Sequence, residues 1–216
     1  MKIISTNIAK PKTITWKGKE VPTGLYKFSV DGGISLGNED VLHDHVMDRR
    51  YHGGIDKACY LYSSDHYEYW KQLYPDLEMP WGMFGENLSV EGLQEKEVNI
   101  GDTYKIGDVL VQVTQPRQPC FKLQFRFDDN NIVRRFIDSG FSGVYVRVLK
   151  KGRVKPGDTM QLVDKKQSLS IHEVYRLLYA NEFDSKVKVA VNDPFIAESC
   201  KRDLLKRWGD QLAVNE

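Results

Sequence analysis

The sequence has 216 residues, of which 41% are apolar and 28% are charged, and its formal net charge is +1. This size and composition suit one sizeable folded domain, with or without a small appendage. The near-neutral charge argues against a nucleic-acid partner or a membrane surface, and no apolar stretch reaches the roughly 20 residues that span a bilayer. No apolar segment of signal-peptide length follows the first residues. The three cysteines are far apart and form no CxxC pair, so a reducing, cytoplasmic location is the simplest expectation.

The first three quarters of the sequence resemble short strands separated by glycine-containing turns. Within residues 103–114, Gly107-Asp108 predicts a hairpin turn that places Val109, Val111 and Val113 on one face. The other predicted strands cover residues 2–10, 24–30, 57–64 and 86–92, with a pair around Lys151-Gly152 in residues 142–158. Many short strands with glycine turns predict a mainly β protein, a β-barrel decorated by a few helices.

Helical periodicity occurs at two places among these strands. Residues 64–75 carry a candidate N-cap at Ser64 and end at Pro75, with His66 expected on the solvent side. Residues 130–140 have apolar side chains at roughly helical spacing.

The pattern changes near residue 165, and three helices are predicted behind it. They cover residues 168–180, capped by Ser168 or Ser170, then 185–193, then 194–210 with Pro194 in the first turn. We therefore predict a β-barrel domain over 1–164 and a helical domain over 165–216. The helical part is too small to be stable alone, so we expect it to pack on the barrel or on a partner subunit of a homodimer.

Cys120 lies in the stretch VTQPRQPCFKL, residues 113–123. Pro116 and Pro119 fix the backbone there and end the preceding strand. A cysteine thiolate is a nucleophile and a soft-metal ligand, and Arg117 and Lys122 are cations that favour it. The residues alone leave a second interpretation equally open, in which Cys120 is a small buried apolar side chain. The three cysteines of the chain are too far apart in sequence to indicate a disulfide framework or a zinc ribbon.

The stretch DRRYHGGIDKACYLY, residues 48–62, gathers cationic side chains around two glycines. Arg49, Arg50, His52 and Lys57 surround Asp56, a composition that suits an anion such as a phosphate. The alternative is a charged surface turn that leads into a buried strand. No P-loop or dinucleotide-binding fingerprint is present.

Two further groups carry candidate chemistry. His43, His45 and His52 lie within ten residues, which is compatible with a zinc hydrolase, although no HExxH motif or cysteine pair supports that reading. Asn87 follows Gly85-Glu86 at the start of a strand, where its amide could contact a heterocycle, or where it could simply form a turn.

Taken in order, RRYHGGIDKA, DHYEYW, FGENLSVEGL, GDVLVQVTQPRQPCFKL and VKPGD resemble the MOSC family, named after the C-terminal domain of molybdenum cofactor sulfurases. Within that family the sequence is similar to the stand-alone bacterial YiiM-type proteins, over nearly the whole chain. The resemblance implies a MOSC-type β-barrel followed by a small C-terminal three-helix domain.

The same resemblance implies that the chain binds the molybdenum cofactor, a molybdopterin, with Cys120 as the molybdenum ligand. It places Arg117 and Asn87 at the pterin, and it makes His52 a candidate for proton delivery. The remaining matched positions are the cofactor-binding candidates Arg49, Arg50, Asp56 and Lys57, of which the two arginines would hold the terminal phosphate. Relatives often carry a glycine where this chain has His43, before Asp44, which leaves the conformation of that loop open.

The implied activity is the reduction of N-hydroxylated compounds such as hydroxylaminopurines, with electrons from a separate donor protein. An alternative is a sulfur carrier that holds a persulfide on Cys120. Some members are fused to a pyridoxal-phosphate-dependent desulfurase, but this sequence has no room for such a domain, so no pyridoxal phosphate is expected.

Overall fold

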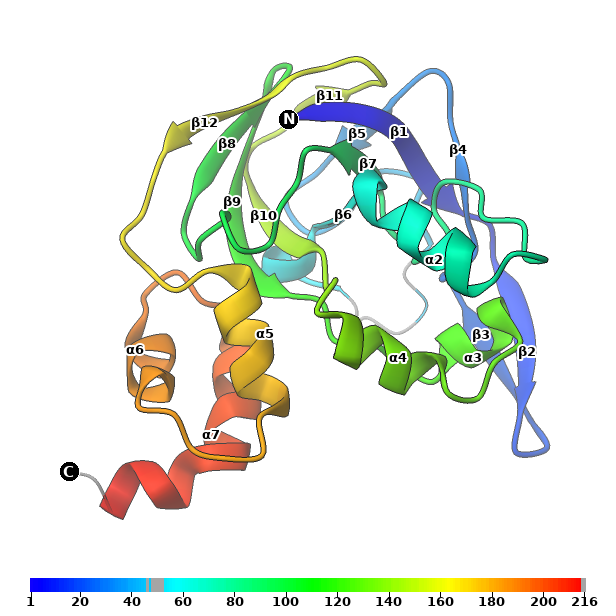
Figure 1. Cartoon of the computed structure of the whole chain (residues 1–216). Coiled ribbons are helices and arrows are strands. Elements are labelled where there is room, and N and C mark those ends of the chain that lie inside the picture. The colour runs from blue at the N-terminus through cyan, green and yellow to red at the C-terminus, as the bar shows by residue number, and fades with distance from the viewer. Residues whose placement is uncertain (46, 48–52, 215–216) are drawn as a thin grey trace.

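The computed structural model describes residues 1–45, 47 and 53–214 (Figure 1). The strands are β1 Lys2–Ala9, β2 Lys12–Trp16, β3 Lys19–Thr23, β4 Lys27–Ser29, β5 Ile34–Leu36, β6 Cys59–Ser63, β7 Leu88–Glu91, β8 Thr103–Ile106, β9 Val109–Pro116, β10 Val144–Lys150, β11 Gly152–Val154 and β12 Met160–Asp164. The helical segments are η1 Ile55–Lys57, η2 Ser64–His66, α2 Tyr67–Leu73, α3 Lys122–Phe127, α4 Ile132–Ser139, α5 Ile171–Tyr179, α6 Lys186–Asn192 and α7 Glu198–Val214.

The main sheet formed by the described residues has eight strands in the order β12-β8-β9-β10-β6-β7-β1-β4. It is not closed, so the prediction of a β-barrel is wrong. The fold is a mixed one, a large open sheet with helices around it. An isolated bridge joins Lys2 to Thr159, next to the start of β12. The end of β1 is paired with β4 instead, through Asn7–Ala9. Only the first residues of β1 therefore reach the β12 side, and no continuous ladder closes the sheet.

The predicted hairpin around Gly107-Asp108 is confirmed by the antiparallel pairing of β8 with β9. Gly107 has a φ of +56°, as a tight two-residue turn requires. Val109, Val111 and Val113 are all fully buried. The strands predicted on either side of Lys151-Gly152 are β10 and β11, but β11 pairs with β5 and not with β10.

The helix predicted from residue 64 begins later than expected. Ser64 lies in the short segment η2, where its hydroxyl contacts Asp65, and the residue before α2 is His66. The expectation that His66 faces solvent is wrong, because its side chain is buried.

In the C-terminal part, Ser170 is the N-cap of α5 and forms a capping box with Glu173. It is one of the two residues that the sequence predicted as this cap. Pro194 is not in a first helical turn, because α7 begins only at Glu198. Figure 1 shows α5, α6 and α7 gathered at one end of the sheet. Except for Tyr175, their buried apolar side chains belong to the same apolar cluster as those of the sheet. The division near residue 165 stays a prediction.

Two elements that the sequence pattern did not predict build the opposite end of the molecule, the β2–β3 hairpin and α3. Trp16 of the hairpin stacks on Phe121 at a centroid distance of 4.7 Å and meets Phe125 of α3 edge-on at 5.8 Å. These contacts fix the hairpin beside the segment that follows β9. Across the described residues, no helix has the length and apolar character of a membrane span.

Candidate functional site

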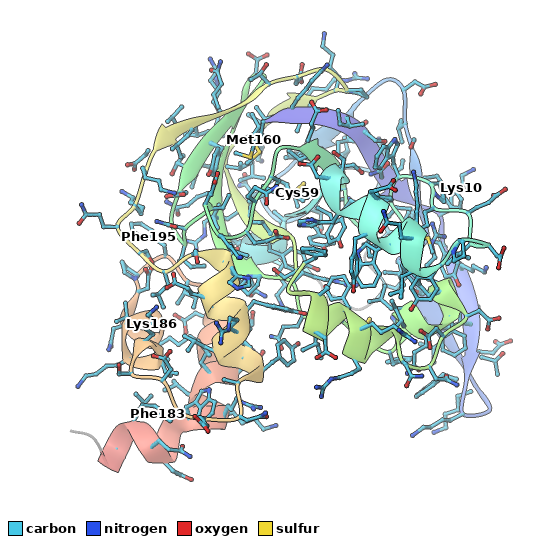
Figure 2. The ribbon with its side chains drawn as sticks, viewed as in Figure 1. Lys10, Cys59, Met160, Phe183, Lys186 and Phe195 are labelled. Atoms are coloured by element: carbon cyan, nitrogen blue, oxygen red, sulfur yellow. The ribbon has the colours of Figure 1, made fainter. Side chains whose placement is uncertain are left out.

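Cys120 lies in the connection between β9 and α3. Pro116 is the last residue of β9, which confirms the predicted end of that strand. Cys59 and Cys200 are fully buried, as Figure 2 illustrates for Cys59 inside the sheet region. Burial raises the pKa of Cys59 far above its ordinary value and that of Cys200 to about 12, so both are neutral core side chains. Cys120 is partly exposed and lines two pockets.

The first pocket, here the basic pocket, lies between β4, the segment 84–87 and the Cys120 connection. Its lining includes the cations Lys27, Lys57, Arg117 and Lys122. Its other lining residues are Thr23, Gly24, Leu25, Asp44, His45, Met47, Ala58, Tyr60, Phe84, Gly85, Asn87, Cys120 and Tyr145. Lysine and arginine outnumber carboxylates in this lining, so the pocket suits an anionic ligand.

The second pocket, here the α7 pocket, borders the basic pocket and shares Lys57, Cys120, Lys122 and Tyr145 with it. It is also lined by Val21, Gln115, Gln118, Pro119, Phe121 and, from α7, Asp203. Cys120 therefore lies where the two pockets meet, and the α7 pocket is lined by residues as distant in sequence as Val21 and Asp203.

Arg117 is the most deeply buried cation of the basic pocket, with 5% of its surface exposed. Its guanidinium carbon lies 5.5 Å from the ring centre of Tyr60 and 5.1 Å from that of Phe136. Its Nη1 is buried and has no hydrogen-bond partner among the described residues. A buried charged donor without a partner is unfavourable, so this atom calls for an acceptor that a bound anion would supply.

Asp44 joins three segments at the edge of the basic pocket. It forms an ion pair with Lys27, accepts a hydrogen bond from the Ala9 amide at 2.7 Å and accepts another from the Asn87 amide group at 2.8 Å. Burial would raise the pKa of Asp44, but Lys27 and these donors outweigh it and hold the pKa below its ordinary value. The preceding residue, His43, has a φ of +65°, the left-handed region that favours glycine. The histidine thus occupies a glycine-type turn, and Asp44 is held in place beyond it.

Asn87 lines the basic pocket, but its amide group is already bonded within the protein. Besides Asp44, its amide nitrogen donates to the Asn7 carbonyl at 3.3 Å, and its oxygen accepts from the Tyr60 amide at 3.2 Å. Its neighbour Glu86 is fully buried and accepts from Tyr67, Gly82, Phe84 and Ser89. Both side chains fix the wall of the pocket, and a direct contact of Asn87 with a pterin stays a prediction.

Two candidate residues of the HGGIDKA motif, Asp56 and Lys57, have different surroundings. Asp56 pairs with Arg147 at 2.8 Å and is not among the lining residues of either pocket. Lys57 lines both pockets, and burial lowers its pKa, an effect that nearby Asp203 partly offsets. Arg49, Arg50 and His52 lie outside the described residues.

The sequence pattern missed several residues of the site. Lys27 is 7% exposed, whereas the neighbouring Phe28 is 45% exposed, so the polar side chain of β4 faces the pocket and the apolar one faces solvent. Tyr145 lines both pockets from β10, and burial raises its pKa to about 12. For Lys27 the local signal was a lysine within a strand of alternating apolar and polar residues. No local sequence feature indicated that Tyr145 or Asp203 belongs to the site.

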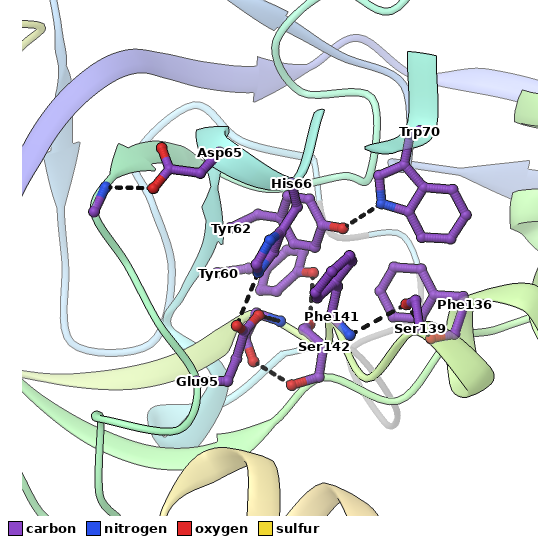
Figure 3. Close-up of polar contacts among 12 residues, drawn as sticks. Tyr60, Tyr62, Asp65, His66, Trp70, Glu95, Phe136, Ser139, Phe141 and Ser142 are labelled. Atoms are coloured by element: carbon purple, nitrogen blue, oxygen red, sulfur yellow. Dashed lines mark hydrogen bonds and ion pairs between the residues drawn. The ribbon is translucent and has the colours of Figure 1, made fainter. Parts of the chain in front are cut away.

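A buried polar cluster supports the Tyr60 wall from behind (Figure 3). His66 contacts the Glu95 carboxylate at 2.9 Å and stacks on Phe141 at a centroid distance of 3.8 Å. The same carboxylate accepts from the Gly143 amide at 2.9 Å, and Tyr60 donates to the neighbouring Ser142 carbonyl at 2.8 Å. The cluster holds the turn before β10 and, through it, the phenol of Tyr60.

The described residues contain no group of three or more histidine, cysteine or acidic side chains arranged to hold a metal ion. His52, one member of the predicted zinc group, lies outside that part of the chain. The zinc interpretation therefore has no support from the residues that can be placed. A metal bound mainly by its own organic ligand, with one cysteine from the protein, needs no such group.

The MOSC domain family matches residues 48–161 of the chain. Protein YflK of Bacillus subtilis (strain 168) is 33% identical over 98% of this chain and 96% of its own length. A protein named reductase from Gibberella moniliformis is 39% identical over 68% of this chain, which is 27% of its own length. The crystal structure of YiiM from Geobacillus stearothermophilus superposes with a TM-score of 0.80 at 34% identity, over 95% of this chain and 98% of that one. By sequence match and by fold, the chain belongs to the MOSC domain family and is of the YiiM type.

Proposed function

We propose that the basic pocket binds the molybdenum cofactor with Cys120 as the metal ligand, and that the chain reduces N-hydroxylated compounds such as hydroxylaminopurines. The observation that carries the proposal is buried Arg117, which lines the same pocket as the partly exposed Cys120 and whose Nη1 has no hydrogen-bond partner among the described residues. The membership of the MOSC family and the similarity to a protein named reductase agree with it.

The residues present fit such a cofactor. A thiolate is a soft donor of the kind that soft metal centres accept, and Cys120 supplies it. Arg117 would bind anionic oxygens of the pterin part through its fixed fork of donors, and Lys57 and Lys122 would add positive charge. The rings of Tyr60 and Tyr145 give the pocket flat apolar walls.

The proposed reaction breaks one N–O bond. A compound R–NH–OH takes up two electrons and two protons and gives R–NH₂ and water. When bound, the molybdenum centre supplies the two-electron chemistry, and a separate electron-donor protein replenishes the electrons. The protein excludes bulk water and places the substrate near Cys120. His52 remains the candidate that delivers protons.

The test uses protein purified from a host that makes the molybdenum cofactor. The loaded protein is incubated with 6-hydroxylaminopurine and reduced methyl viologen, and adenine is measured by chromatography. We expect adenine from the loaded protein and none from the same protein made in a host blocked in cofactor synthesis. A molybdenum-loaded protein that forms no adenine would overturn the reductase assignment.

A sulfur-carrier role is favoured by one observation, the exposure of Cys120 at the junction of two pockets. In that role a desulfurase persulfide transfers its outer sulfur to the thiol, which becomes a persulfide while the donor returns to a thiol. Mass spectrometry after incubation with a cysteine desulfurase and cysteine tests it. A mass gain of one sulfur at Cys120 would support the role, and an unchanged mass would reject it.

A further inference from the structure

The α7 pocket lies beside the proposed cofactor site and has a different character. Both pockets contain Lys57, Cys120, Lys122 and Tyr145, so any ligand in one would lie next to a ligand in the other. The α7 pocket lacks Arg117 and Lys27 in its lining and gains the carboxylate of Asp203. Its charges are therefore more nearly balanced, which suits a neutral polar molecule better than an anion.

The wall that α7 contributes is held firmly against β9. The amide of Ala197 donates to the Thr114 carbonyl at 3.1 Å, and the Ser199 hydroxyl bonds the Gln115 side chain at 2.8 Å. One turn further along, the side-chain amide of Gln118 donates to an Asp203 carboxylate oxygen at 2.7 Å. The carboxylate of Asp203 from α7 and the side-chain amide carbonyl of Gln118 from the Cys120 connection are thereby held side by side as a pair of acceptors.

Acceptors of this kind recognise the N–H groups of an amino-substituted heterocycle. Phe121 and Tyr145 supply aromatic surfaces in the same pocket, and bases stack well on such rings. Phe121 is fixed by its stacking on Trp16, so its ring is already in place before a ligand arrives.

We propose that the α7 pocket is the substrate-docking site, and that it takes a neutral N-hydroxylated amino-heterocycle. Asp203 and Gln118 are its specificity-determining residues, through the N–H groups of the base. This inference rests on the proposed function for the reaction, but the docking site itself is a property of the chain alone. It gives α7 a direct part in the site, through Asp203.

Two variants test the site in the cofactor-loaded protein. Asp203→Asn keeps the shape of the side chain and removes its charge. Val21→Trp fills the pocket from the β2–β3 hairpin, at a residue that does not line the basic pocket. We expect KM for 6-hydroxylaminopurine to rise about tenfold in each, the size of one lost charge-assisted hydrogen bond in the first case. Molybdenum content and kcat should stay within twofold of the wild type. Asp210→Asn, on the exposed side of the same helix, is the matched control and should leave KM unchanged.

A second measurement needs no turnover. Binding of adenine, the product base, to the cofactor-free protein is followed by isothermal titration calorimetry. We expect binding to weaken by a similar factor in both variants and not in Asp210→Asn. Unchanged KM and unchanged adenine affinity in both variants would overturn the docking site. If the wild type holds no molybdenum or shows no turnover, the proposed function fails, and adenine binding alone then decides whether the docking site stands.

Discussion

Arg117 allows a prediction that separates the demands of folding from those of ligand binding. In the cofactor-free protein, a buried donor without a partner costs about 1–3 kcal/mol. The two cation–π contacts, at 5.5 and 5.1 Å, return about 0.5–1 kcal/mol each. These contributions nearly cancel. Arg117→Met should therefore change the free energy of unfolding of the cofactor-free protein by no more than about 1 kcal/mol, or roughly 2–4 °C in Tm.

The same substitution should weaken cofactor retention strongly. Charge-assisted hydrogen bonds contribute about 1.5–3 kcal/mol, so the loss corresponds to a roughly 10- to 150-fold weaker affinity. Urea unfolding of the cofactor-free protein measures the first effect, and the molybdenum retained after dialysis of the loaded protein measures the second.

Arg126→Met is the matched control. Arg126 also has a buried nitrogen, Nε, without a partner among the described residues, and lies 4.6 Å from the Tyr26 ring centre, but it lines neither pocket. It should retain molybdenum as the wild type does. The reasoning would be refuted by an Arg117→Met protein that loses more than about 3 kcal/mol of stability, or by one that retains the cofactor fully.

Three further predictions concern individual side chains. A maleimide should label one cysteine of the native, cofactor-free protein and none of Cys120→Ser, because Cys59 and Cys200 are buried. Labelling of two or more sites in mass spectra would contradict the view that Cys120 is the accessible cysteine. His43→Gly should raise the free energy of unfolding, measured in urea, by up to about 1 kcal/mol. The left-handed conformation of His43 costs about 1–2 kcal/mol, and the larger entropy that glycine loses on folding offsets part of this gain. His45→Gly should instead lower the free energy of unfolding. Asp44→Asn should destabilise the protein by about 3 kcal/mol at pH 7 because it leaves Lys27 buried without its counter-charge. Since the folded pKa of Asp44 is depressed, that difference should be full above about pH 4 and shrink as the pH falls further; a difference independent of pH in urea titrations would refute it.

The sequence predicted local elements better than their assembly. The hairpin at Gly107-Asp108 and the cap at Ser170 follow from turn and capping chemistry, which acts over a few residues. Whether the sheet closes does not follow from such local chemistry. It depends on which strand pairs with β1, and β4 pairs with the last residues of β1. Likewise, the alternation of apolar and polar residues in β4 does not indicate which face of the strand is buried. In the structure Lys27 lies on the buried face, toward the pocket.

The site was predicted in part for the same reason. The prolines before Cys120 indicate a rigid connection. Arg117 and Lys57 line the same pocket as Cys120, whereas their role toward a cofactor stays a prediction. Asp56 belongs to the same motif as Lys57, but its ion pair with Arg147 is formed by β10, which the motif cannot reveal. Asp203 enters the α7 pocket only through the packing of a helix near the other end of the chain. Contacts between distant segments leave no local signal in the sequence.

The most direct test of the central proposal is the molybdenum and pterin content of three proteins from a cofactor-producing host. The wild type, Cys120→Ala and Cys200→Ala are purified in parallel and measured by metal analysis and pterin fluorescence. We expect about one molybdenum with its pterin per chain in the wild type and in Cys200→Ala, whose thiol is a buried core group, and loss of the metal in Cys120→Ala. Full molybdenum in Cys120→Ala would contradict the assignment of Cys120 as the metal ligand.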